Sequence, residues 1–89
     1  MNLNKNWRVI IVNSAKKNFS RLPKNDSELI EKAIDQMELN PFSGDIIKLS
    51  GEESTWRRRV GNYRIIFEIL SEKNIIYIFR VERRASKTY

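Results

Sequence analysis

The chain has no histidine and no cysteine among its 89 residues. Without cysteine it can form neither a disulfide framework nor a thiolate metal site, which is compatible with a reducing compartment. Without histidine, proton transfer near neutral pH has to use another side chain, because the residue that most often acts as general base is missing. Acidic residues at metal-ligand spacing are also missing, so we expect no metal and no other cofactor.

Long apolar runs are absent too. No stretch approaches the roughly 18 residues that a membrane span needs. The N-terminal segment MNLNKNWRVIIV lacks the apolar region and small-residue cleavage site of a signal peptide. We therefore expect a cytoplasmic protein without membrane contact. Hydrophobic residues at 40% and charged residues at 31% are typical of a globular domain, and the length predicts one domain, residues 1–89, with a small core.

Positive charge is what the chain has in excess, with a net charge of +6. Residues 1–47 carry seven basic and six acidic side chains, whereas residues 48–89 carry ten basic and five acidic ones. Seven of those ten are arginine, whose planar fork of donors suits phosphate. A polyanion is the natural partner, nucleic acid first and an acidic protein segment second. The plainer alternative is charge carried only for solubility.

Hydrophobic periodicity predicts an α+β fold with an N-terminal strand at residues 7–12, WRVIIV. Asn13 or Ser14 would cap a short helix that ends before Pro23. A second helix runs to Asn40-Pro41, and the spacing of Asn25 and Glu28 suggests a capping box. Four strands follow, at residues 46–49, 56–60, 63–70 and 75–82. We expect an antiparallel sheet of three to four strands with the helices packed on one face.

The segment TWRRRVGNYR, residues 55–64, is the most informative part of the chain. Gly61-Asn62 suits a two-residue hairpin turn, since glycine tolerates a positive φ. The hairpin would pair Arg59 with Arg64, and faces alternate along each strand. One face then collects the apolar residues Trp56, Val60, Tyr63, Ile65 and Phe67, and the other collects Arg57, Arg59 and Arg64. Arg58 falls on the apolar face, near an edge where its stem could snorkel.

This arrangement costs stability, because like charges directly opposite each other destabilise a sheet. A strand built only for folding would place glutamate or threonine opposite Arg59. Arginines converging on one face are favourable if that face binds phosphate, which indicates an anion site. The C-terminal segment RVERRASKTY adds Arg83, Arg84, Lys87 and Tyr89. Arginines around an aromatic ring are typical of single-stranded RNA sites, although a solvated basic tail is the simpler interpretation.

The element order, together with NPFSGDIIKLSG, WRRRVGNYRIIFEI and the basic end with its tyrosine, resembles the RelE/ParE superfamily of bacterial toxins from Trp7 to Tyr89. RelE-like members are messenger-RNA endonucleases that enter the ribosomal A site. The resemblance implies a set of catalytic residues, namely Arg57, Arg59, Arg64, Arg83 and Tyr89. It also implies RNA or ribosome contacts by Lys48, Arg58, Arg84 and Lys87.

The departure from the family pattern concerns the general base. Lysines occupy the positions of Arg57 and Arg59 in the best-known RelE-like pattern, and arginine is a poor proton acceptor. Tyr89 is the first candidate, because neighbouring guanidinium groups favour its phenolate, and Glu82 is the second. The implied reaction is attack of a ribose 2′-hydroxyl on the adjacent phosphate, with arginines neutralising the transition state.

The resemblance also implies a partner, a cognate antitoxin with an acidic segment that wraps the toxin. The toxin alone would be a monomer, and with antitoxin it would form a hetero-oligomer. Two alternative functions stay open. One is a ParE-like gyrase poison on the same fold without RNase activity. The other is a non-toxic basic module that binds nucleic acid or a partner protein.

Overall fold

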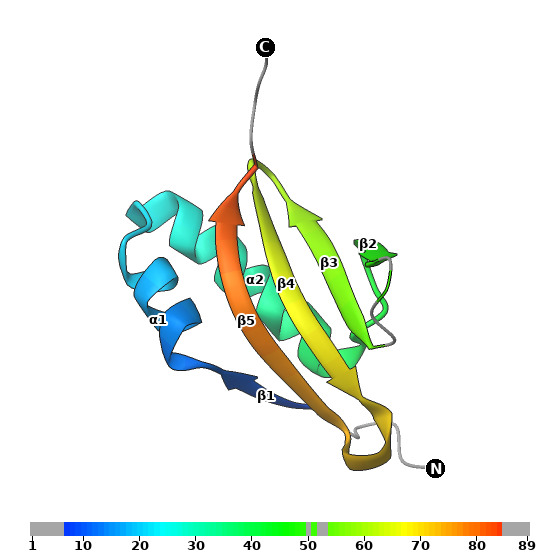
Figure 1. Ribbon diagram of the computed structural model, residues 1–89. Coiled ribbons are helices and arrows are strands. Elements are labelled where there is room, and N and C mark those ends of the chain that lie inside the picture. Colours follow the sequence, from blue (N-terminus) through cyan, green and yellow to red (C-terminus); the bar gives the residue numbers. More distant parts are fainter. Residues whose placement is uncertain (1–6, 50, 52–53, 85–89) are drawn as a thin grey trace.

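The structure is a computed structural model that describes residues 7–49, 51 and 54–84. Its elements follow the expected order, with one strand, two helices and four further strands. They are β1 (Arg8–Ile11), α1 (Asn13–Ser20), α2 (Lys24–Leu39), β2 (Asp45–Lys48), β3 (Thr55–Val60), β4 (Tyr63–Leu70), a 3-10 turn η1 (Ser71–Lys73) and β5 (Ile75–Arg83). Figure 1 shows the sheet with α2 crossing behind it and α1 beside β5. The α+β prediction is confirmed.

The strands form one five-stranded sheet in the order β1-β5-β4-β3-β2. Strands β2 to β5 pair antiparallel with their neighbours, as expected. Strand β1 adds a fifth strand that pairs parallel with β5, so the sheet is mixed. A parallel partner needs a crossover connection, and here the two helices between β1 and β2 begin that connection.

Helix α2 covers one face of the sheet with its apolar side. Ile30, Ala33 and Met37 are buried against the central strands. The helix begins after Pro23, and no side chain caps its first turn. The expected capping box of Asn25 and Glu28 is therefore wrong, because Pro23 occupies the N-cap position and Asn25 already lies inside the helix. The stop at Asn40 is confirmed.

Helix α1 continues the edge of the sheet where β1 ends. Strand β1 pairs with β5 only as far as Ile78, and beyond that point the Asn18 side chain accepts a hydrogen bond from the backbone N–H of Val81 at 3.3 Å. An edge strand with free N–H groups invites pairing with other chains, and α1 covers part of that edge. The helix begins at Asn13 after Val12 without a side-chain cap, so neither expected capping residue acts as one.

The β3–β4 hairpin has the predicted register. Val60 pairs with Tyr63, Arg59 with Arg64, and Arg57 with Ile66. Gly61 has φ +58°, the positive value expected at this turn. The face toward α2 carries the core residues of the two central strands, Ile65, Phe67, Ile69, Ile76, Ile78 and Val81. The opposite face of β3, β4 and β5 is covered by neither of the two described helices and is called the open face below (Figure 1).

Strand β5 contains one irregularity that decides which of its residues reach the open face. Ile66 of β4 pairs with Arg80 and the next residue, Phe67, pairs with Ile78, which leaves Phe79 as an extra residue in β5. A bulge of this kind shifts the alternation of faces by one residue. Ile78 points to the helices, and so does Val81, three residues later. None of the helices in the described part of the chain is long and apolar enough to cross a membrane.

Candidate functional site

Arginines from three segments line one hollow on the open face. The hollow has a volume of about 190 Å³, and its walls are the side chains of Arg57, Arg59, Arg64 and Arg84. The first two come from β3, the third lies opposite them on β4, and the fourth follows the end of β5. We call this feature the arginine hollow. The three arginines that the hairpin register predicts on one face are thus brought together.

Two carboxylates at the rim balance part of this charge. Asp45 lies 3.9 Å from Nη1 of Arg59. Glu82 contacts Nε of Arg64 at 3.1 Å and Nε of Arg80 at 3.2 Å. Both oxygens of Glu82 are therefore engaged by guanidinium groups. These pairs lower the cost of placing Arg59 directly opposite Arg64 in the sheet.

Donor capacity remains in the hollow after these pairs are counted. The Nε atom of Arg57 is buried and has no hydrogen-bond partner within the described part of the chain. Neither Arg57 nor Arg84 forms an ion pair with another described residue, although Arg84 donates to the carbonyl oxygen of Gly61 at 3.2 Å. A buried donor without a partner is costly unless a ligand satisfies it. An anion with several acceptor oxygens, such as a phosphate, suits this set of donors.

The end of β5 places two of the predicted site residues differently from the sequence-based expectation. Arg83, expected in the catalytic set, lies outside the hollow, because it pairs with Tyr63 on the helix face and its guanidinium lies over the Tyr63 ring at 5.9 Å. Arg84, expected only as a peripheral RNA contact, lines the hollow instead. The cause is the extra residue at Phe79, which shifts the alternation of the strand by one. Strict alternation from Ile78 would have put Arg83 on the open face.

Arg58 is also corrected. It was expected to contact RNA, but it is buried with 6% of its surface exposed. Its guanidinium donates to Gln36 of α2 and to the Ser43 side chain, the latter at 3.2 Å. Burial lowers the pKa of Arg58. The prediction that it lies on the apolar face is confirmed, but it joins α2 and the following loop to the sheet rather than reaching water.

The remaining predicted contacts are placed in different ways. Lys48 is exposed on β2 and pairs with Trp56, whose neighbour in β3 is Arg57, so its side chain belongs to the face opposite the hollow. Lys87 and Tyr89 lie outside the described residues, and the role predicted for Tyr89 stays a prediction. Over the described ranges, no three or more acidic side chains gather into a possible metal site.

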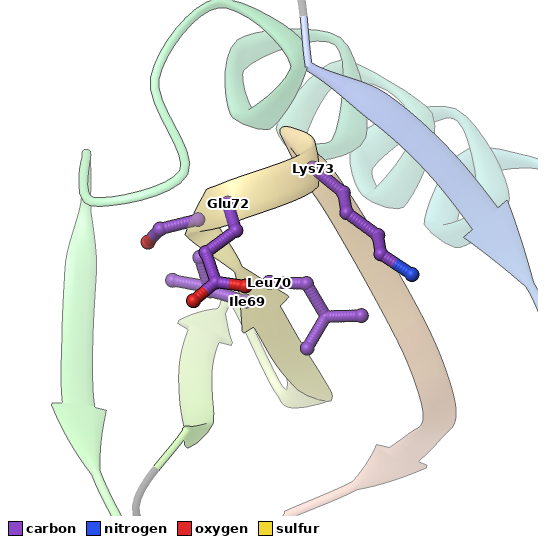
Figure 2. Close-up of a pocket in the computed structure, with 5 residues that line it drawn as sticks. Ile69, Leu70, Glu72 and Lys73 are labelled. Atoms are coloured by element: carbon purple, nitrogen blue, oxygen red, sulfur yellow. The ribbon is translucent and has the colours of Figure 1, made fainter.

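Two further hollows carry less positive charge. One, of about 410 Å³, is lined by the end of β4 and the η1 turn. Figure 2 shows its charged residues, Glu72 and Lys73, together with the apolar Ile69 and Leu70. It contains one charge of each sign and none of the arginines. The other, of about 440 Å³, lies on the open face and is lined by Leu49, Thr55, Ile66, Glu68, Phe79 and Arg80.

Tyr63 is a structural tyrosine rather than a free phenol. Its hydroxyl donates to Oδ2 of Asp26 in the first turn of α2 at 2.7 Å, and its ring is buried. The hydrogen bond to Asp26, with burial and the Asp26 charge, raises the pKa of Tyr63, and Arg83 partly opposes the shift. Tyr63 therefore keeps its proton near neutral pH and fixes the start of α2 against β4.

Comparison with known proteins places these features in context. The profile of the family described as the ParE toxin of the type II toxin-antitoxin system, parDE, matches residues 5–87. The RelE1 protein of Methanocaldococcus jannaschii is 28% identical over 71 residues, which are 76% of this chain and 79% of that protein.

Solved structures of similar fold include two toxin-antitoxin complexes. The archaeal RelE-RelB complex from Pyrococcus horikoshii OT3 has a chain that superposes with a TM-score of 0.81 at 28% identity, covering 92% of this chain and 99% of that one. The RelBE2 complex from Mycobacterium tuberculosis gives a TM-score of 0.77 at 25% identity, covering 89% and 99% of the two chains.

Proposed function

The chain belongs to the ParE toxin family of type II toxin-antitoxin systems, within the RelE/ParE superfamily, and we propose that it acts as a messenger-RNA endonuclease that inhibits translation. The observation that carries the proposal is the arginine hollow. Four guanidinium groups surround a space of about 190 Å³, and a buried Nε atom of Arg57 has no partner among the described residues. These donors suit a phosphate of the RNA backbone.

The proposed reaction is an intramolecular phosphoryl transfer within the RNA. The ribose 2′-oxygen loses its proton and attacks the adjacent phosphorus, and the bond from phosphorus to the 5′-oxygen breaks. The products are a 2′,3′-cyclic phosphate and a 5′-hydroxyl, which takes up a proton. Arg57, Arg59, Arg64 and Arg84 hold the phosphate and stabilise the additional negative charge of the transition state.

The general base is proposed to be Tyr89. A phenol brought into the arginine hollow would lose its proton more easily than a free one, because the positive charges favour the phenolate. Glu82 is the weaker candidate, since both of its oxygens are engaged by Arg64 and Arg80. In this proposal Glu82 orients Arg64 toward the phosphate.

A second candidate function is poisoning of DNA gyrase. The family profile that matches the chain is that of the ParE toxin, which supports this alternative. It leaves the convergence of the arginines and the unpartnered Arg57 Nε without a specific purpose. We therefore rank it below the endonuclease.

The proposed partner in the cell is an antitoxin. Chains of similar fold occur in the archaeal RelE-RelB complex of Pyrococcus horikoshii OT3 and in the toxin-antitoxin complex RelBE2 of Mycobacterium tuberculosis. The net charge of +6 favours a partner segment with acidic residues. Binding would add apolar burial to a chain with a small core and so stabilise it.

The test combines expression without antitoxin and purified components. Wild type is compared with Arg59→Ala and with Arg21→Ala, which removes the same charge from an exposed position at the end of α1. We expect growth arrest and new 5′ ends within translated messages for wild type and Arg21→Ala, and loss of both for Arg59→Ala. Arrest without RNA cleavage, accompanied by blocked supercoiling by purified gyrase, would replace the endonuclease with the second candidate.

A separate comparison identifies the base. Tyr89→Phe removes the phenolic proton acceptor, and Glu82→Gln removes the carboxylate charge but keeps its size. The proposal expects cleavage to be lost in Tyr89→Phe and only reduced in Glu82→Gln. The reverse order would assign the base to Glu82.

A further inference from the structure

A second hollow lies next to the arginine hollow on the same face of the sheet. Its volume is about 440 Å³. Its apolar wall consists of Leu49, Ile66 and Phe79, and its polar rim consists of Thr55, Glu68 and Arg80. Ile66 lines the second hollow and lies next to the arginine hollow, because it pairs with Arg57 and lies two residues from Arg64 on β4. Residues two apart on a strand are about 7 Å apart, which is one side-chain step along the open face.

The bulge in β5 supplies the aromatic residue of this second hollow, Phe79. Phe79 is the extra residue of the bulge, so it is not paired in the ladder with β4. Its side chain is 36% exposed and stacks on Tyr77 with ring centroids 6.5 Å apart and an interplanar angle of 20°. Bulges beside functional sites often redirect a side chain. Here the bulge presents a supported aromatic ring beside a cluster of arginines.

The lining fits a nucleobase better than a phosphate or an aliphatic group. A base has two apolar faces and a polar edge, and the hollow offers an aromatic ring and Ile66 for the faces. For the edge, Thr55 provides a hydroxyl group, and Glu68 and Arg80 provide the carboxylate oxygen and guanidinium nitrogens that the contacts with Ser54 and Glu82 leave over. Aromatic side chains on an open sheet are a common platform for bases of single-stranded RNA.

We propose that this second hollow binds one base of the RNA whose phosphate occupies the arginine hollow, with the Phe79 ring stacked on that base. The inference rests on the proposed endonuclease function and adds a base subsite to it. Its occupant is RNA rather than a partner protein, because the hollow is the neighbour, on the same face of the sheet, of a cluster of arginines suited to the nucleic-acid backbone.

The experiment measures cleavage of messages on programmed ribosomes by the full-length chain. Four proteins are compared: wild type, Phe79→Ala, Phe79→Trp and Phe42→Ala, the last being a matched control because Phe42 is also exposed but packs against Trp56 outside the hollow. Each is tested on an intact message and on messages in which one nucleotide near the cut at a time is abasic but keeps its 2′-hydroxyl. Thermal unfolding of each variant verifies that it is folded.

Loss of stacking on one base is expected to slow cleavage of the intact message by roughly 5- to 100-fold in Phe79→Ala. Phe79→Trp and Phe42→Ala should cut at nearly the wild-type rate. On the message that is abasic at the contacted position, wild type and Phe79→Ala should cut equally slowly. A purely structural role of Phe79 predicts instead the same loss on every message.

Other results would overturn the inference. If wild type cuts and Phe79→Ala cuts equally well, the base subsite is wrong while the proposed function stands. If Phe79→Ala cuts normally but no longer binds its antitoxin, the occupant is the partner protein. If wild type does not cut any message, the proposed function fails, and the base subsite fails with it.

Discussion

Arg83 and Arg84 are adjacent in the chain but lie on opposite faces of the sheet. Arg84 lines the arginine hollow and also donates to the Gly61 carbonyl oxygen at 3.2 Å. Arg83 lies over the ring of Tyr63, at 5.9 Å from its centroid, on the side of the helices. Of these two neighbouring arginines, Arg84 thus belongs to the candidate site and Arg83 to the packing of the fold.

This difference predicts opposite effects of two equivalent substitutions. Arg84→Ala should slow RNA cleavage by roughly 10- to 100-fold, because one donor to the transition state is lost, and should change stability little. Arg83→Ala should keep most of the cleavage activity and lower the free energy of unfolding by about 0.5–1 kcal/mol, the value of an exposed cation–π contact. Cleavage rates and urea unfolding of both variants measure this. Full activity of Arg84→Ala together with an inactive Arg83→Ala would return Arg83 to the catalytic set.

Arg58 and Arg59 form a second contrasting pair. Arg58→Ala removes a buried guanidinium and leaves Gln36 and Ser43 without their donor, so the free energy of unfolding should fall by about 2–3 kcal/mol. Arg59→Ala should stay within about 0.5 kcal/mol of wild type, because its surface ion pair is weak and removal relieves repulsion with Arg64. Urea denaturation gives both values. Equal destabilisation by the two substitutions would contradict the buried position of Arg58.

Gly44 is predicted to be required for the packing of Arg58. A Cβ atom at Gly44 would lie 2.7 Å from Cζ of Arg58, and the residue has φ +82°. Gly51 provides the control, since it has φ +80° and no atom within 4 Å of an added Cβ. Both alanine variants should lose about 1–2 kcal/mol from backbone strain. Gly44→Ala should lose about 1–3 kcal/mol more from overpacking against Arg58. Thermal unfolding of the two variants measures the difference. Equal stabilities would mean that Arg58 moves aside and would contradict the prediction.

The hydrogen bond between Tyr63 and Asp26 predicts a pH dependence of stability. The pKa of Tyr63 is raised in the folded chain, so its contribution to stability is complete below the unfolded value of about 10 and is lost as pH rises through the folded value. The difference in unfolding free energy between wild type and Tyr63→Phe should therefore be constant up to pH 9 or so and shrink above about 10. Denaturation at a series of pH values measures it, and a difference that grows at high pH would contradict the assigned direction.

Local features of the chain are predictable from sequence because local interactions determine them. The β3–β4 register follows from a glycine at the turn and from alternation over six residue pairs, all within one hairpin. The stop of α2 at Asn40 follows from the proline after it. The convergence of Arg57, Arg59 and Arg64 depends on the same hairpin, so it could be predicted with it.

The features that sequence patterns miss depend on contacts between distant segments. The parallel pairing of β1 with β5 joins residues that are more than sixty positions apart. Burial of Arg58 depends on Gln36 of α2 and on Ser43, which the alternation of β3 does not reveal. The capping box of Asn25 and Glu28 and the cap at Asn13 or Ser14 both fail, because the helices begin after Pro23 and Val12 without a side-chain cap. The bulge at Phe79 has no turn residue to mark it, and it moves Arg84 rather than Arg83 to the open face.

The bulge also affects how this strand is compared with its relatives. An extra residue in β5 changes the phase of the strand, so every later side chain belongs to the face that a relative without the bulge gives to the residue before it. An alignment without a gap here pairs each later residue with one whose side chain lies on the opposite face of the relative's sheet. A one-residue gap at Phe79 keeps the faces in correspondence. Arg84 is then aligned with the residue that occupies the same place on the open face of the relative, rather than with the residue at the same distance from the C-terminus.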